Sequence, residues 1–128
     1  MPAEPKPLGL LLLAGSHERA HFAFVLAAGA AALGRQVVLF ATNRGCHALL
    51  ADWSGLAGSE RDAVLQARGV AGLGELRDAC HDLAVRMIVC EAGLAAEALT
   101  GHPLAPGVEV AGVASFLAET AQGQVISL

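Results

Sequence analysis

Short apolar runs of strand length alternate with helical stretches along almost the whole chain, and this alternation constrains the fold most. The first run, Leu8 to Ala14, is continuously apolar, which is typical of a central parallel strand covered on both faces. Ser16 is placed to cap a helix that runs to about Leu33 and ends before Gly34. Strands and helices then keep alternating, which predicts a parallel sheet with helices on both faces.

The same reasoning places the remaining elements. Further strands are expected at residues 36–41, 86–90, 108–112 and 124–128. Further helices are expected at residues 46–50, 59–68 (capped by Ser59), 73–83, 91–99 and 113–120. The predicted fold class is a three-layer α/β/α domain with a five-stranded parallel sheet in a doubly wound, Rossmann-like arrangement. We expect residues 1–7 to form a disordered, proline-rich tail and residues 8–128 to form a single domain.

The composition limits the partners of the chain. It is 55% hydrophobic and only 16% charged, more apolar than a small monomer needs, so part of its surface is expected to meet other subunits. The net charge is −4 and no basic patch occurs, which argues against direct binding to nucleic acid or to an anionic membrane. The glycine-rich segment 52–74 has two open interpretations, a mobile flap or an oligomer contact.

Cys90 is the strongest candidate for chemistry. It closes the expected strand 86–90 and opens a stretch of small, helix-forming residues. Its thiol is therefore expected at the carboxyl end of a strand, the edge where open parallel sheets bind ligands. The partial positive charge of a helix N-terminus favours the reactive thiolate of a cysteine placed there. The alternative is an inert buried cysteine, since free cysteines are among the most buried residues.

Other polar residues are expected near the same edge. Ser16, Asn43, Arg44 and Gly93 are the possible ligand-edge residues. His17 is a candidate for stabilising the Cys90 thiolate, or else it only decorates the start of its helix.

The other two cysteines have different expected roles. Cys46 could act as a resolving thiol, although a packed small residue is favoured, and Cys80 lies on the apolar face of its helix and is expected in the core. Three cysteines without dense disulfide spacing suit a reducing, cytoplasmic compartment. His47 follows Cys46 and His81 follows Cys80, but adjacent helical residues point about 100° apart, so neither pair chelates alone and we expect no metal site. No glycine-rich phosphate-binding motif follows the first strand, and we expect no organic cofactor.

The segment Leu83 to Leu99, with its Val-Cys-Glu-Ala-Gly-Leu-Ala-Ala turn, resembles the cysteine loop of the DsrE/DsrF/DsrH-like family, which includes TusD-like sulfur-relay proteins. The stretch 107–125 is similar to the family's last strand, helix and strand. The resemblance implies a homotrimer or homohexamer, or assembly with paralogous subunits. It also implies that Cys90 carries sulfane sulfur as a persulfide between protein donors and acceptors.

Glu91 departs from the family pattern, because TusD-type relatives carry a small or apolar residue after the cysteine. A carboxylate there opposes the thiolate unless it points to solvent, and it could also donate a proton for persulfide release. The expected function is that of a small sulfurtransferase-like carrier that uses Cys90, with Glu91 and His17 as candidate helpers. Two alternatives stay open: a non-enzymatic, oligomeric small-ligand-binding module, and a peroxiredoxin-like redox protein that pairs Cys90 with Cys46.

Overall fold

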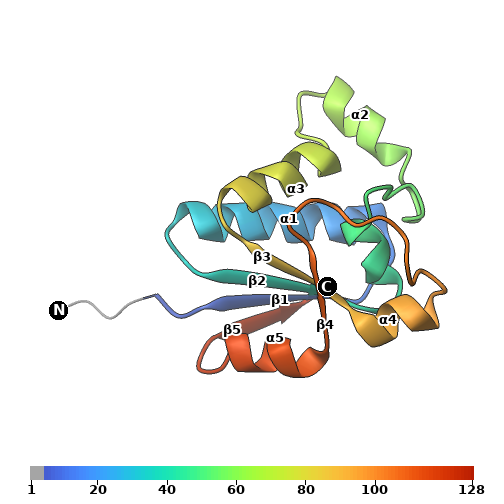
Figure 1. Cartoon of the computed structure of the whole chain (residues 1–128). Helices are drawn as coiled ribbons and strands as arrows, with labels where there is room; N and C mark the ends of the chain where they lie inside the picture. The colour runs from blue at the N-terminus through green and yellow to red at the C-terminus, as the bar shows by residue number, and fades with distance from the viewer. Residues whose placement is uncertain (1–4) are drawn as a thin grey trace.

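A computed structural model describes residues 5–128 and shows a central parallel sheet between two helical layers (Figure 1). The strands are β1 (Leu8–Leu12), β2 (Val37–Ala41), β3 (Arg86–Cys90), β4 (Glu109–Ala111) and β5 (Gln124–Ser127). The helices are α1 (His17–Ala32), the 3₁₀ helix η1 (Asn43–Leu49), α2 (Arg61–Ala67), α3 (Leu73–Asp82), α4 (Glu91–Ala96) and α5 (Val113–Glu119). The strand order is β4-β3-β2-β1-β5 with every pair parallel, so the predicted fold class is confirmed.

Three predicted helix boundaries were wrong for local reasons. The helix after Cys90 ends at Ala96 because Ala98 adopts a φ of 57° and the N–H of Leu99 bonds the carbonyl of Leu94, a Schellman-type ending. The piece expected at 46–50 is a 3₁₀ helix that starts earlier, at Asn43. The helix expected to be capped by Ser59 begins at Arg61 and follows Glu60, which makes no side-chain cap bond.

The strand side chains alternate between two cores of unequal size. Leu10, Leu39 and Met87 belong to the larger core, which also holds buried residues of α1 and α3. The alternate residues Phe40, Ile88 and Cys90 belong to a smaller cluster with Phe116 of α5. Figure 1 shows α1 and α3 on one side of the sheet and α5 on the other. The period-two pattern of β3 therefore points Cys90 toward the side of the sheet that carries α5.

Gly9 of β1 allows α5 to approach the sheet closely. A Cβ atom at this position would lie 2.6 Å from Cγ2 of Thr120 and 2.9 Å from Cζ of Phe116. We expect Gly9→Ala to lower the free energy of unfolding by about 2 kcal/mol, because the added methyl group overpacks this interface. Urea denaturation measures the effect, with Gly29→Ala as the control because a Cβ there would meet nothing within 4 Å beyond its own helix. Equal stability of the two variants would contradict this account.

The segment between η1 and α3 packs against α1. Leu56 and Asp62 are buried, and the N–H of His17 bonds the carbonyl of Ala57 at 2.8 Å. These are the contacts of a fixed segment, which argues against the interpretation of residues 52–74 as a free flap.

At the amino end, residues 5–7 have no regular structure, but the carbonyl of Pro7 accepts a bond from the N–H of Gln124. The rest of the expected tail, residues 1–4, lies outside the described part. Within residues 5–128, no helix combines the length and the apolar character that crossing a membrane requires.

Candidate functional site: the Cys90 turn

Cys90 stands at the junction between β3 and α4. It is the last residue of the strand and the N-cap of the helix, with φ −68° and ψ 122°. Its Sγ accepts a hydrogen bond from the N–H of Gly93 at 3.3 Å. The residue is 8% exposed and packs beside Ile88 and Phe116. The turn therefore places a backbone N–H donor against the sulfur at the carboxyl end of β3.

The first residues of η1 form one wall of this turn. At Gly93, the position that a Cβ would occupy lies against Thr42 Oγ1, the Asn43 backbone nitrogen and Cys46 Sγ. Asn43 and Gly93, two of the predicted edge residues, therefore do meet beside Cys90. The loop after β2 and the helix after β3 come together because the carboxyl ends of neighbouring parallel strands share one edge of the sheet.

Glu91 and Arg44 lie farther into solvent than the thiol. Glu91 is exposed, so its carboxylate has the solvent-facing placement that we considered from the sequence. The Arg44 side chain is 83% exposed, and its Nε lies 3.8 Å from Oε1 of Glu97, an ion pair of little energetic weight. The sequence did not single out Glu97, because it lies in the ending of α4 and only the fold brings it to Arg44.

His17 is engaged away from the cysteine. Its ring is fully buried, and its Nε2 is 2.7 Å from Oδ1 of Asp62, while its ring stacks on that of His21 at a centroid distance of 5.5 Å. His17 therefore does more than decorate the start of its helix, and its bond to Asp62 argues against the interpretation that it stabilises the Cys90 thiolate. Asp62 was missed because 45 residues separate it from His17 and no local pattern links them. Ser16 caps α1 as predicted, accepting a bond from the N–H of Arg19.

The two remaining cysteines are sealed in the protein. Burial raises the pKa of Cys46 to about 11, with smaller contributions from Cys90 and Glu97. Burial also raises the pKa of Cys80 to about 11, and this thiol bonds the carbonyl of Phe24, so the predicted core position is confirmed. Both thiols are fully shielded from solvent. At neutral pH only about one in ten thousand of either would be ionised.

We therefore expect iodoacetamide to modify the native protein once, at Cys90. The other two thiols should react only after denaturation, because alkylation requires an exposed thiolate. Intact-mass spectrometry counts the adducts, and Cys90→Ser should give none under native conditions. A second adduct formed as fast as the first in the native wild type would show that burial does not protect Cys46 or Cys80.

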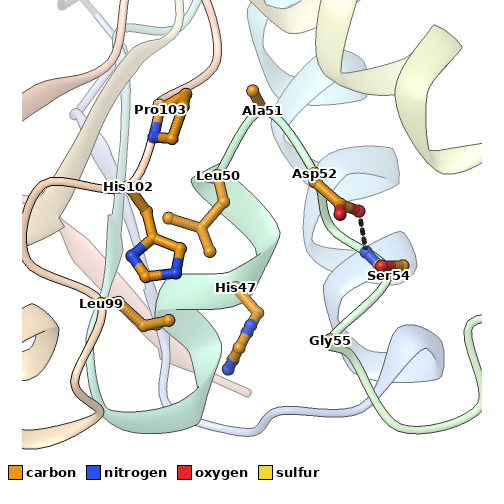
Figure 2. Close-up of a pocket in the computed structure, with 9 residues that line it drawn as sticks. All are labelled: His47, Leu50, Ala51, Asp52, Ser54, Gly55, Leu99, His102 and Pro103. Atoms are coloured by element: carbon orange, nitrogen blue, oxygen red, sulfur yellow. Dashed lines mark hydrogen bonds between the residues drawn. The ribbon is translucent and has the colours of Figure 1, made fainter.

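A hollow of about 290 Å³ lies between the end of η1, the loop that follows it and the segment that follows α4 (Figure 2). Its lining combines apolar side chains with the imidazoles of His47 and His102. The lining residues are His47, Leu50, Ala51, Asp52, Ser54, Gly55, Leu99, His102 and Pro103. The Asp52 carboxylate accepts a bond from the N–H of Ser54 at 2.9 Å, and hydrogen bonds from Ser54 lower the pKa of Asp52. Gly55 lies directly against the His47 ring. Cys90 does not line this hollow, so a ligand there would not touch the thiol.

The fold and the site together define a small parallel α/β domain with a cysteine at the tip of an inner strand. The chain belongs to the DsrE/DsrF-like family, which it matches over residues 8–128. This result confirms the resemblance found in the sequence. Among residues 5–128, no group of three or more His, Cys, Asp or Glu side chains is arranged to hold a metal ion.

Individual relatives agree with this assignment. The chain is 27% identical over 145 residues to the sulfur carrier protein DsrE2 of Allochromatium vinosum, an alignment that covers 88% of this chain and 91% of that one. The ychN protein of E. coli has a similar fold, with a TM-score of 0.73 and 16% identity over 98% of this chain and all of the other. MTH1491 of Methanobacterium thermoautotrophicum, a protein of unknown function, gives a TM-score of 0.56 at 17% identity with the same coverage. The two solved structures support the fold alone.

Proposed function

We propose that this chain is a cytoplasmic sulfur carrier that accepts sulfane sulfur on Cys90 and passes it to an acceptor. The observation that carries the proposal is the Cys90 turn, where the least buried of the three cysteines, 8% exposed, receives the Gly93 N–H. Membership of the DsrE/DsrF-like family and the similarity to a protein named a sulfur carrier support the same reading.

The proposed chemistry needs only a nucleophilic thiolate. The Cys90 thiolate attacks the outer sulfur of a donor persulfide, R–S–SH, and forms the Cys90 persulfide while the donor leaves as R–S⁻. An acceptor thiolate then attacks the outer sulfur, and Cys90 leaves as a thiolate. Sulfane sulfur is transferred without net oxidation, so no cofactor enters either step. The Gly93 N–H is placed to stabilise the inner sulfur whenever it is anionic.

The predicted helper residues take different places in this proposal. Glu91 is adjacent to Cys90 and solvent-facing, which suits a carboxyl group that exchanges protons with water near the persulfide. His17 has no part in the proposal, because its Nε2 is already bonded to Asp62. Redox pairing of Cys90 with Cys46 is disfavoured by the complete burial of Cys46 and its raised pKa.

We also propose that copies of this chain, or related subunits, associate. Four apolar side chains of β4, α5 and β5 remain 47% to 61% exposed: Val110, Val113, Leu117 and Val125. Their coverage by another subunit would remove apolar surface from water. Light scattering coupled to size-exclusion chromatography measures the mass of the particle in solution.

The test of the proposed function is direct sulfur uptake. The protein is incubated with inorganic polysulfide and desalted, and its intact mass is measured before and after treatment with dithiothreitol. We expect a gain of about 32 Da, the mass of one sulfur atom, that the reductant reverses. Wild-type protein that gains no mass would contradict the proposal. That result would favour the second candidate, a small-ligand-binding module, for which the hollow beside His47 and His102 is the specific observation.

A further inference from the structure

We infer that Gly93 positions the reactive sulfur, because the missing side chain lets the first turn of α4 lie against η1 while its Gly93 N–H bonds Cys90 Sγ. The inference rests on the proposed function, since it concerns the sulfur that would carry the persulfide. Gly93 contacts the reacting sulfur through its own backbone N–H. Its missing side chain acts only by setting where that N–H lies.

The space around Gly93 explains why a glycine occupies this helix. A Cβ atom here would lie 2.9 Å from Cys46 Sγ, and 3.1 Å from both the Asn43 nitrogen and Thr42 Oγ1. The backbone does not require glycine, because Gly93 has no positive φ and lies within a helix, where alanine is favoured by about 1 kcal/mol. Close contact with η1 is therefore the reason for the glycine.

η1, which forms this wall, cannot shift away from α4 because it is packed against the end of β1. Gly45 is buried, and a Cβ on it would strike the Leu12 carbonyl oxygen. The N–H of Gly45 bonds the carbonyl of Leu13 at 3.1 Å, and the N–H of Thr42 bonds that of Leu12 at 3.0 Å. These bonds fix η1 to the end of β1.

A methyl group at position 93 would therefore displace α4 rather than η1. The displacement would draw the residue 93 N–H away from Cys90 Sγ, from its present 3.3 Å. An anionic sulfur would then lose a charge-assisted hydrogen bond. We expect Gly93→Ala to slow sulfur loading about tenfold at neutral pH, and to move the pH profile of Cys90 alkylation toward higher pH.

The experiment compares wild type, Gly93→Ala and Gly29→Ala, the last being the same change in a helix where nothing lies within 4 Å. Loading by inorganic polysulfide and alkylation by iodoacetamide are followed by intact mass from pH 6 to pH 10, with circular dichroism as the check of folding. Only Gly93→Ala should load slowly and shift its alkylation profile. A merely structural role would lower stability without shifting this profile.

A second pair of variants tests the contact itself. Cys46→Ala should load like wild type, and Cys46→Ala with Gly93→Ala should load faster than Gly93→Ala alone, because the nearest obstructing atom is gone. If Gly93→Ala does not fold, the double variant is compared with Cys46→Ala, and it should load more slowly because the Thr42 and Asn43 contacts remain.

Two results separate the possible failures. An unchanged loading rate and alkylation profile in Gly93→Ala, or equal loading of the double variant and Cys46→Ala, would overturn the role of Gly93. Wild type that takes up no sulfur would overturn the proposed function instead. In that case the alkylation profile alone decides whether Gly93 positions the sulfur.

Discussion

Cys90→Ser should abolish sulfur uptake completely, so that inorganic polysulfide produces no mass gain of about 32 Da. The reason is chemical, because a serine hydroxyl is not ionised near neutral pH and cannot form a persulfide. Folding should survive the change. Serine is among the best N-cap residues, and its oxygen can accept the same Gly93 N–H that the sulfur accepts now.

The matched control for this loss is Cys46→Ala. This variant removes a thiol in contact with the same turn but fully buried, so it should gain one sulfur like wild type. Sulfur uptake by Cys90→Ser at the wild-type level would assign the carrier role to another thiol. Loss of uptake in Cys46→Ala, with the fold intact, would revive a two-cysteine mechanism.

The second large effect is expected at Asp62. Removal of its carboxylate should destabilise the segment between η1 and α3, which packs against α1. Asp62 accepts hydrogen bonds from three groups, the His17 ring, the Leu73 N–H and the Gln66 amide. Asp62→Ala leaves these groups without their partner, and both His17 and the Leu73 backbone are buried. We expect a loss of about 3 kcal/mol in the free energy of unfolding, measured by urea denaturation.

The control is Asp52→Ala, because Asp52 is an exposed aspartate that bonds only the nearby Ser54. Its replacement should cost much less. Similar losses in the two variants would mean that the buried network around Asp62 adds little to stability.

The same network makes stability depend on acid. Burial alone would raise the pKa of Asp62, but hydrogen bonds from His17, Leu73 and Gln66 outweigh it and lower the pKa. The folded protein thus holds the carboxylate ionised below the unfolded pKa of about 4, so the stabilisation is present above that pH and is lost as the pH falls through the lowered value. Asp62→Asn has no such titration. The stability gap between wild type and Asp62→Asn should therefore narrow as the pH falls below about 4.

Much of the architecture could be predicted because local patterns encode it. Continuous apolar runs such as Leu8 to Ala14 indicated buried parallel strands, and β3 was placed at its observed boundaries from its β-branched residues. The Cys90 turn followed from the change of pattern at that residue. Boundaries failed where a single backbone conformation decided them, as at Ala98, whose positive φ ends α4 early.

The arrangement of the site was less predictable. His17 follows the first strand, so its place at the sheet edge was clear, but its partner Asp62 lies 45 residues away. Glu97 and the two histidines of the hollow carried no signal in the sequence, because they belong to loops and helix ends. Such pairings depend on how loops pack, and no periodicity records that.

The sequence by itself determined the layering of this protein and the position of Cys90 at a strand tip, since strand and helix periodicities are local properties of the chain. Only the tertiary structure decided how deeply each cysteine is buried and which groups surround its thiol. Cys46, Cys80 and Cys90 are the same residue type, and only Cys90 keeps any exposed surface, 8% of the residue, because β3 ends beside η1 and points it away from the larger core. Solvent exposure depends on contacts between distant segments, and these form only when the chain is folded.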